Sequence, residues 1–207
     1  LGHLMKVIGL TGGIGAGKGE VASILNSLGA KVLDADKVGH SIYEPNTEGW
    51  TRVHSIFGDL VVDHQSGRID RGKLAALVFD DEQRRIFLNE AIHPLIRIEI
   101  ERLINKHKTD GVEVLVIEAT LFFEAGWQDI ADEVWAISAP KQVIIRRLKE
   151  QRRLTNTEIN KRLAAQRTDI WRKNRSDVFI NNNTDLNDLR MKVIQVWEKR
   201  ILGSVKP

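Results

Sequence analysis

A glycine-rich turn followed by a lysine is the segment whose residue types are best suited to chemistry. Residues 12–18 have the spacing G-x-x-x-x-G-K, which binds phosphate groups when it joins a strand to a helix. Glycine lets the backbone approach closely, so that several N–H groups converge on the phosphates, and Lys18 adds a full positive charge. The start of the following helix adds a partial one. The sequence therefore predicts a nucleotide site whose contacts are Gly13, Ile14, Gly15, Ala16, Gly17, Lys18, Gly19 and Glu20.

The residue after Lys18 departs from the usual motif. Serine or threonine normally follows the lysine and its hydroxyl group helps to hold Mg²⁺, whereas Gly19 and Glu20 follow it here. A magnesium ion would then be held by phosphate oxygens, water and carboxylates elsewhere. Glu20 could supply one carboxylate, but an acid in the first turn of a helix also interacts favourably with the helix dipole. Both roles stay open.

Short apolar runs that alternate with helix-patterned segments must position this turn. The runs, rich in β-branched residues and leucine, are residues 6–10, 31–33, 114–117, 134–137 and 178–180. Such runs are typical of strands covered on both faces. Residues 21–28 have apolar positions at helical spacing, with Gly29 as the expected end of that helix. The alternation predicts an α/β fold: a three-layer α/β/α arrangement with a central parallel sheet. Asp185 is expected to cap a last helix with an apolar stripe at Leu186, Leu189, Val193, Val196 and Trp197.

Two segments interrupt this alternation. Residues 43–104 are too long for one crossover and have a mostly helical pattern, with a turn at residues 63–67. Residues 151–174 form a basic helical excursion, in which Thr155 and Glu158 make a capping box. Both are candidates for mobile covers over substrate and nucleotide. Proline at position 94 should interrupt or begin a helix in the first segment.

The basic excursion allows three interpretations, namely a solvated helical face, an RNA-binding patch or a set of phosphate clamps. Binding of single-stranded RNA calls for aromatic residues interleaved with the basic ones. Trp171 is the only aromatic residue between Trp135 and Phe179, so RNA is the least favoured interpretation.

Composition limits the class of protein. The chain has 207 residues, a net charge of +3 and no cysteine, so disulfides and thiolate metal sites are excluded and a reducing compartment, the cytoplasm, is expected. No apolar run approaches the roughly 18 residues of a membrane span. Residues 1–4 are expected to be an addition left by cloning, with Met5 as the natural start. We expect no nucleic-acid or membrane partner, and a monomer or weak homo-oligomer.

Several segments, in order along the chain, resemble one family. They are residues 8–18, Asp-Ala-Asp at 34–36, Ile-His-Pro-Leu-Ile-Arg at 92–97, Leu-Phe-Phe-Glu at 121–124, Gln166 and residues 177–182. Together they resemble the dephospho-CoA kinases. Gly19, Thr120 and Ser176 depart from the family pattern, and only Gly19 touches the expected chemistry.

The resemblance implies a reaction and an organisation. The implied reaction transfers the γ-phosphoryl group of ATP, with Mg²⁺, to the 3′-hydroxyl group of dephospho-CoA, giving CoA and ADP. The implied parts are a nucleotide-binding core (about residues 5–36, 112–150 and 176–207), a helical CoA-binding domain (about 37–111) and a lid (about 151–175).

Carboxylates at strand ends are the candidates for catalysis and metal binding. Asp36 is expected to orient the acceptor hydroxyl group or take its proton, because open α/β sheets carry their chemistry at the carboxyl ends of their strands. The alternative is that Asp36 caps the following helix. Asp34 is divided between Mg²⁺ binding and packing, and Glu118, at the end of its strand, is a candidate Mg²⁺ ligand.

The remaining candidates are substrate and phosphate contacts. The family pattern suggests substrate binding by His93 and Arg97. Glu124 is expected either to order the loop that follows it or to contact the substrate. Arg147 and Arg152 are the preferred phosphate contacts, since a guanidinium group matches phosphate oxygens; Arg146 and Arg153 compete with them. Asn181, with Asn182 beside it, falls where the family contacts adenine.

Two other functions compete with the implied one. A kinase for another small acceptor, such as a nucleotide, is compatible with the phosphate-binding loop, but the matches at residues 34–36 and 92–97 argue against it. A nucleotide-binding protein that has lost catalysis would explain Gly19, but Lys18 and Asp36 argue against it.

Overall fold

A computed structural model describes residues 5–79 and 81–204, so the expected cloning addition at residues 1–4 lies outside the described part. The chain divides into two units. One unit comprises Leu1–Leu33 and His107–Pro207, and the other comprises Asp34–Lys106. Within the described ranges, no helix is long and apolar enough to span a membrane.

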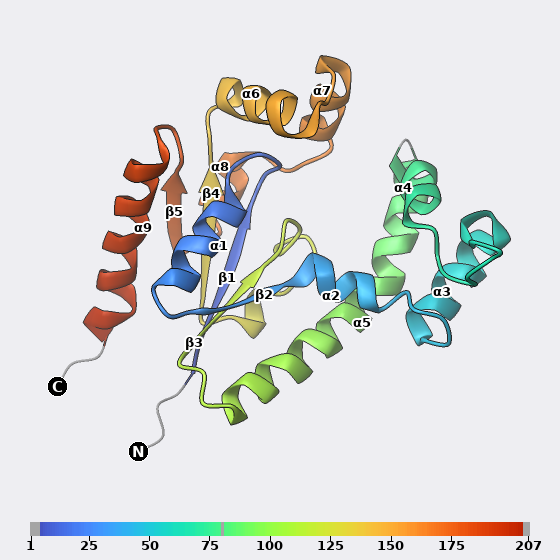
Figure 1. Cartoon of the computed structure of the whole chain (residues 1–207), viewed down its shortest axis with the longest axis horizontal. Coiled ribbons are helices and arrows are strands. Elements are labelled where there is room, and N and C mark those ends of the chain that lie inside the picture. Colours follow the sequence, from blue (N-terminus) through green and yellow to red (C-terminus); the bar gives the residue numbers. More distant parts are fainter. Residues whose placement is uncertain (1–4, 80, 205–207) are drawn as a thin grey trace. The chain divides into compact units, whose positions relative to one another are not determined.

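The first unit contains a five-stranded sheet with the order β2-β3-β1-β4-β5 (Figure 1). The strands are β1 (Lys6–Gly12), β2 (Lys31–Asp34), β3 (Val114–Glu118), β4 (Glu133–Ser138) and β5 (Val178–Asn181). Pairing is parallel between β1 and both β3 and β4, and between β4 and β5. Because β1 lies between β3 and β4, the turn after β1 leaves the sheet at the point where strand order reverses. This is where open α/β sheets bind ligands.

Side chains on the two faces of β1 explain the layers around the sheet. Ile8 and Leu10 are buried in a core together with Val21 and Leu25 of α1 (Lys18–Ser27) and with α9 (Leu186–Arg200). On the opposite face, Gly9 is covered by the ring of Phe122, and the short helix α8 (Asp169–Lys173) packs near β4. The predicted three-layer α/β/α fold with a parallel sheet is confirmed.

Both N-caps that were predicted in this unit are confirmed, and the apolar stripe of α9 differs from the prediction at one residue. Asp185 accepts a hydrogen bond from Asp188 N and caps α9 as predicted, and Thr155 with Glu158 forms the predicted capping box of α7 (Asn156–Ala164). The prediction for Leu186 was wrong, because this side chain is 58% exposed and α9 buries only the later part of its stripe. Helix α1 starts at Lys18, three residues before the first apolar position that the pattern could detect. The remaining elements are α6 (Lys141–Arg152), η2 (Gln128–Ile130) and η3 (Leu202–Ser204).

The second unit is helical, as predicted. Its elements are α2 (Ala35–Ser41), α3 (Glu48–Phe57), η1 (Gly58–Val61), α4 (Arg71–Phe79) and α5 (Glu82–Thr109). The predicted turn at residues 63–67 is present: the Asp63 carboxylate accepts hydrogen bonds from the N–H groups of Gln65 and Ser66. On either side of it, Val62 and Ile69 pair as an antiparallel bridge.

The prediction that Pro94 interrupts or begins a helix was wrong. Helix α5 runs through Pro94 without a break. Proline removes one N–H donor from a helix, but burial of Leu88 and Ile92 before it and of Ile96 and Ile100 after it holds both halves in place. An apolar stripe of this length outweighs the loss of one hydrogen bond.

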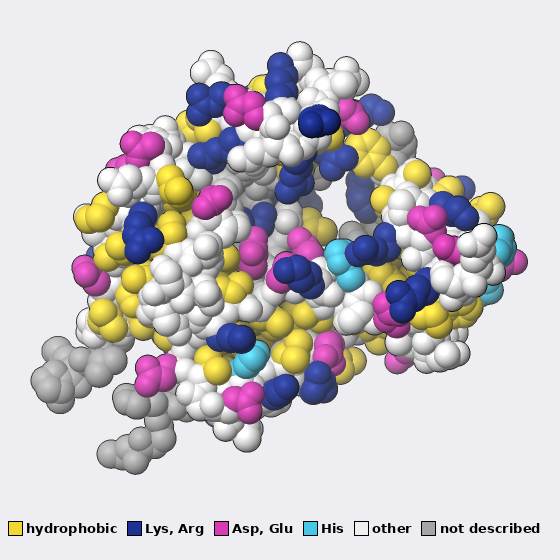
Figure 2. Space-filling view, viewed as in Figure 1, with side chains coloured by type: hydrophobic (Ala, Val, Ile, Leu, Met, Phe, Trp, Pro, Cys, Tyr) yellow, Lys and Arg dark blue, Asp and Glu magenta, His cyan; other side chains and the backbone are white. Residues whose placement is uncertain are grey.

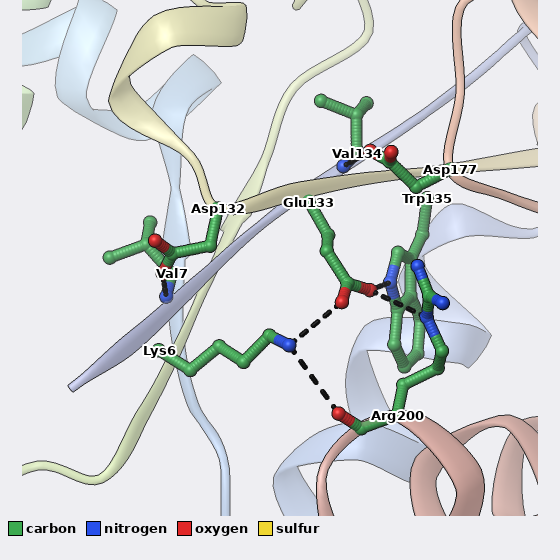
Figure 3. A network of polar contacts seen from close by, with 8 residues as sticks. All are labelled: Lys6, Val7, Asp132, Glu133, Val134, Trp135, Asp177 and Arg200. Carbon is green, nitrogen blue, oxygen red and sulfur yellow. Dashed lines mark hydrogen bonds and ion pairs between the residues drawn. The ribbon is translucent and has the colours of Figure 1, made fainter. Parts of the chain in front are cut away.

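Two aspartate side chains form hydrogen bonds with the backbone near the beginning of β1 and β4 (Figure 3). Asp132 accepts a hydrogen bond from Val7 N at 2.7 Å, and Asp177 accepts one from Val134 N at 2.8 Å. Each carboxylate thereby satisfies a backbone donor where a strand enters the sheet. These contacts lie at the amino ends of the strands, opposite the end that carries the phosphate-binding loop.

Glu133 joins the sheet to α9 at the same end (Figure 3). Its carboxylate accepts hydrogen bonds from Lys6 Nζ at 2.7 Å, Trp135 Nε1 at 3.0 Å and Arg200 Nε at 3.1 Å. Burial alone would raise the pKa of Glu133, but the hydrogen bonds from Lys6, Trp135 and Arg200 outweigh it and the pKa is lowered. The ionised form of Glu133 therefore stabilises the folded state.

Glu133→Gln should lower the free energy of unfolding near neutral pH by about 1–3 kcal/mol, since hydrogen bonds to a charged group are lost. A carboxyl group with a lowered pKa contributes stability above its unfolded pKa of about 4.3, and this contribution disappears as pH falls through the folded pKa. The difference between wild type and variant should therefore shrink on acidification. Urea unfolding from neutral to acid pH measures it, with Glu198→Gln on the exposed face of α9 as the control. A difference that stays constant with pH would contradict the role of the Glu133 charge.

Candidate functional site

The turn between β1 and α1 has the backbone of a phosphate-binding loop. Gly15 and Gly17 have φ angles of 71° and 101°, in the left-handed region, which glycine adopts without strain. Gly17 is the residue at the N-cap of α1, and no side chain caps the helix in the described structure. The start of α1 is therefore suited to bind an anion, because the helix dipole favours negative charge there.

Asn182 contacts the end of the loop, next to the start of α1. Its side chain is buried and its Nδ2 group donates to the carbonyl oxygen of Ala16 at 2.9 Å. A Cβ atom at position 17 would lie 2.3 Å from this Nδ2 atom, so only glycine fits between Asn182 and the start of α1. The backbone of Asn182 donates to Ser138 O at 2.7 Å, which ties the residue to the end of β4.

Arg147 holds the same part of the loop from α6. Its guanidinium group donates to Gly15 O and Ala16 O, both at 3.4 Å, and to Asn182 Oδ1 at 3.2 Å. Burial lowers the pKa of Arg147 and the neighbouring Arg146 adds to this effect, while Glu20 opposes it. Arg147 thus places positive charge against the loop, while its contact with phosphate stays a prediction. Figure 2 shows further Lys and Arg side chains over the α6–α7 segment at the top of the view.

A cleft of about 430 Å³ opens above the loop. The residues that line it come from the loop, α1, β3, α6 and the start of α9: Gly15, Gly17, Lys18, Gly19, Glu20, Glu118, Arg147, Gln151, Arg152, Asn182, Leu186 and Leu189. Lys18 Nζ donates to Gly12 O at 3.1 Å, which keeps its charge at the mouth of the loop. Three cationic side chains thus line one cleft, and this arrangement suits a polyphosphate.

Two carboxylates share this cleft with Lys18. Glu118 ends β3 as predicted, and Glu20 lies exposed in the first turn of α1. Among residues 5–79 and 81–204, no three His, Asp or Glu side chains cluster closely enough to hold a metal ion. The donor set still suits Mg²⁺, which usually takes one or two protein carboxylates and completes its shell with substrate phosphates and water.

Asp34 and Asp36, two predicted site residues of the second unit, lie at the start of α2. Asp34 is the N-cap of α2, where it accepts a hydrogen bond from Lys37 N at 3.1 Å and pairs with Lys37 Nζ at 3.3 Å. The strand ends at Asp34, not at Asp36 as predicted. Capping by Asp34 starts the helix one residue later, so Asp36 lies exposed in the first turn of α2. The cap that was considered for Asp36 therefore belongs to Asp34.

His93 and Arg97 lie one turn apart on α5. Burial lowers the pKa of His93, so its imidazole group is neutral near pH 7. Arg97 Nε donates to Glu101 at 2.8 Å along the same helix. A neutral imidazole and a guanidinium group held by a neighbouring acid are able to bind a polar or anionic ligand.

The predicted site residues Glu124, Asn181 and Arg152 differ in whether they line the cleft. Glu124 is exposed in the turn after β3, and it does not line the cleft above the loop. Asn181 is also exposed, at the end of β5, whereas Asn182 lines the cleft. Arg152 lines it as predicted, but as the last residue of α6.

Known proteins resemble the chain along most of its length. A family model described as dephospho-CoA kinase matches residues 6–188. A dephospho-CoA kinase from Dehalococcoides mccartyi is 38% identical over 197 residues, which cover 95% of this chain and 98% of the relative. Among solved structures, TT1252 from Thermus thermophilus superposes with a TM-score of 0.79 at 28% identity, over 98% of this chain and 99% of its own. Dephospho-CoA kinase from Campylobacter jejuni gives a TM-score of 0.70 at 28% identity, and the superposition covers 98% of this chain and 100% of that protein's chain.

The contacts of Gly17 and Gly19 predict opposite effects of the same substitution two residues apart. Gly17→Ala should destabilise the protein by about 1–3 kcal/mol, because a left-handed alanine is strained and its Cβ atom displaces Asn182. Gly19 has nothing within 4 Å of its Cβ position and lies in the first turn of α1. Gly19→Ala should therefore stabilise the protein, by up to about 1 kcal/mol. Urea unfolding midpoints measure both, and equal effects of the two substitutions would contradict the described contacts.

Proposed function

Because this chain belongs to the dephospho-CoA kinase family, we propose that it transfers the γ-phosphoryl group of ATP to the 3′-hydroxyl group of dephospho-CoA. The products are CoA and ADP. The observation that carries this proposal is the cleft above the phosphate-binding loop, where Lys18, Arg147 and Arg152 come together. A cleft that combines a glycine-rich loop, a free helix start and three cations suits the polyphosphate of a nucleotide.

The chemistry of phosphoryl transfer explains the kind of residues in the cleft. The transition state is loose and spreads negative charge over the oxygens of the transferred group, so catalysis consists mostly of positioning and charge neutralisation. Lys18 lies at the mouth of the loop and would contact the β and γ oxygens. Arg147 and Arg152, from α6, would neutralise charge that develops during transfer.

For the acceptor, the proposal rests on the family resemblance of particular residues. Asp36 would orient the 3′-hydroxyl group or accept its proton. His93, Arg97 and Glu124 would contact dephospho-CoA. In this organisation the helical segment from about residue 37 to 111 binds the acceptor, and about residues 151–175 act as a lid over the nucleotide core.

Bound Mg²⁺ would neutralise part of the charge on the phosphate groups. Glu118 is the carboxylate that we propose on the metal side, because it lines the cleft together with Lys18. Asp34 remains a weaker candidate, since its carboxylate already caps α2 and pairs with Lys37. Without a hydroxyl group at position 19, water and phosphate oxygens would complete the shell.

ADP release in the presence of Mg·ATP tests the function directly. Dephospho-CoA should support turnover with CoA as the product, whereas nucleosides and nucleotides should not. Lys18→Ala should lower the rate by several orders of magnitude, because it removes charge that stabilises the transition state, whereas Lys199→Ala on the exposed face of α9 should not change it. Tight ATP binding without turnover on any acceptor would contradict the proposal and identify a protein that has lost the reaction.

Gly19→Ser tests how the metal is held. The open space around position 19 accommodates a serine side chain, and a hydroxyl group there can bind Mg²⁺. We expect the variant to need less Mg²⁺ for half-maximal activity, by about tenfold, equivalent to one good ligand contact. A Mg²⁺ titration at saturating substrates measures this, with Gly19→Ala as the control for the backbone change. An unchanged requirement would mean that another ligand already takes the place of the hydroxyl group.

A further inference from the structure

Gln166 reaches the phosphate-binding loop from a distant part of the chain. It lies between α7 and α8, and its Oε1 atom accepts a hydrogen bond from Ile14 N at 2.9 Å. The two residues are 152 positions apart in the sequence. Ile14 is the second residue after β1, so this contact fixes the beginning of the loop, whereas Asn182 and Arg147 fix its end.

Gly13 leaves the space in which this contact forms. A Cβ atom at position 13 would lie 3.2 Å from Gln166 Oε1 and 3.7 Å from Arg172 Nη1. The two side chains therefore lie directly over the backbone of Gly13. The close packing indicates that the first turn of the loop is held from outside by the α7–α8 segment.

Arg172 fixes the segment that carries Gln166. This arginine is 2% exposed, and its Nη1 group donates to Arg167 O at 2.7 Å and to Asp169 Oδ1 at 3.3 Å. Arg167 is the next residue after Gln166, so the guanidinium group determines where the glutamine backbone lies. Burial raises the pKa of Asp169, and the neighbouring Arg172 opposes this effect.

The burial of Arg172 is costly. Its Nε and Nη2 atoms are buried without a hydrogen-bond partner among the described residues. A buried, incompletely paired charge lowers stability, and such groups occur where function requires them. The residue that this arginine positions through Arg167 O is Gln166, the partner of Ile14 N.

Apolar packing adds a second link between the same segments. The Ile14 side chain packs on a small core of Ala139, Ile144, Leu148 and Ile159, from the end of β4, α6 and α7. The backbone N–H group of Ile14 is thus held by Gln166, and its side chain is held by residues between 139 and 159. Ile14 therefore links the position of residues 139–166 to the conformation of the loop.

We propose that Gln166 is a positioning residue of the phosphate-binding loop and that Arg172 holds Gln166 in place. By accepting the hydrogen bond of Ile14 N, Gln166 would fix the first peptide groups of the loop, so that the following N–H groups converge on the phosphates before the nucleotide arrives. The consequence for nucleotide binding rests on the proposed function, whereas the fixing of the loop does not. Loss of Gln166 should therefore weaken ATP use without affecting the acceptor.

The first test needs no nucleotide. In the nucleotide-free protein, ¹⁵N-resolved hydrogen exchange at Ile14 N should become about tenfold faster in Gln166→Ala, as expected for loss of one hydrogen bond. Gln195→Ala, the same change at an exposed position of α9, should leave this rate unchanged. Gln166→Glu keeps an acceptor oxygen and should retain the protection. Unchanged exchange in Gln166→Ala would overturn the proposal.

The second test measures the consequence for catalysis. Gln166→Ala should lower kcat/KM for ATP about tenfold and leave KM for dephospho-CoA unchanged. Arg172→Lys keeps the charge, but its ammonium nitrogen ends one bond short of the position of Arg172 Nη1, so this variant should give a smaller decrease. A faster Ile14 exchange with unchanged kcat/KM for ATP would overturn the positioning role. A wild-type protein without turnover would refute the proposed function alone, because the exchange result stands independently of it.

Discussion

The contact of Asn182 and Arg147 with the carbonyl oxygen of Ala16 is the interaction on which the nucleotide site depends. In a trans peptide unit the C=O and N–H groups point in opposite directions. Because Asn182 Nδ2 and Arg147 Nη1 hold the Ala16 carbonyl on one side, the N–H group of Gly17 is turned to the other. One pair of donors therefore orients the backbone at the start of α1, and the glycine at position 17 is a condition for their approach.

The sheet topology brings together the three segments that take part in this interaction. Asn182 follows β5 and Arg147 follows β4 through α6, whereas the loop follows β1. In a parallel sheet the carboxyl ends of neighbouring strands lie at one edge, so three segments that are distant in sequence meet there. The ion pairs of Glu133 and the aspartate contacts lie at the other ends of the same strands. Stability and binding are thus built at opposite edges of one sheet.

Local patterns predicted the elements of the fold, because the information for each element lies within a few residues. The buried strands, the loop between β1 and α1 and the caps at Thr155 and Asp185 follow from residue type and spacing alone. Errors occurred where a distant or competing contact decides the result. Whether a strand ends at Asp34 or Asp36 depends on which carboxylate caps α2, and the continuity of α5 through Pro94 depends on packing on both sides of it.

Local patterns also fail to identify some of the site residues, because contacts with distant segments decide which side chains line the cleft. Asn181 and Asn182 cannot be distinguished in the sequence, because successive side chains of a strand point to opposite sides and a shift of one residue exchanges them. Along α6, Arg147 and Gln151 lie one helical turn apart and both line the cleft, while Arg153 takes the left-handed position that ends the helix. Gln166 could be noticed only as part of the family pattern, since no local rule connects it with Ile14.

Gly19 shows how far the electrostatics of the cleft make up for a missing ligand. The position has no neighbour within 4 Å, so loss of the hydroxyl group leaves the backbone and the N–H group of α1 as they are. Lys18, Arg147 and Arg152 still face two carboxylates, Glu20 and Glu118, in one cleft. The cations outnumber the carboxylates, so the cleft retains an excess of positive charge that suits phosphate groups. Because phosphoryl transfer depends mostly on positioning and charge neutralisation, a cleft of this charge suits it even though position 19 offers no hydroxyl group.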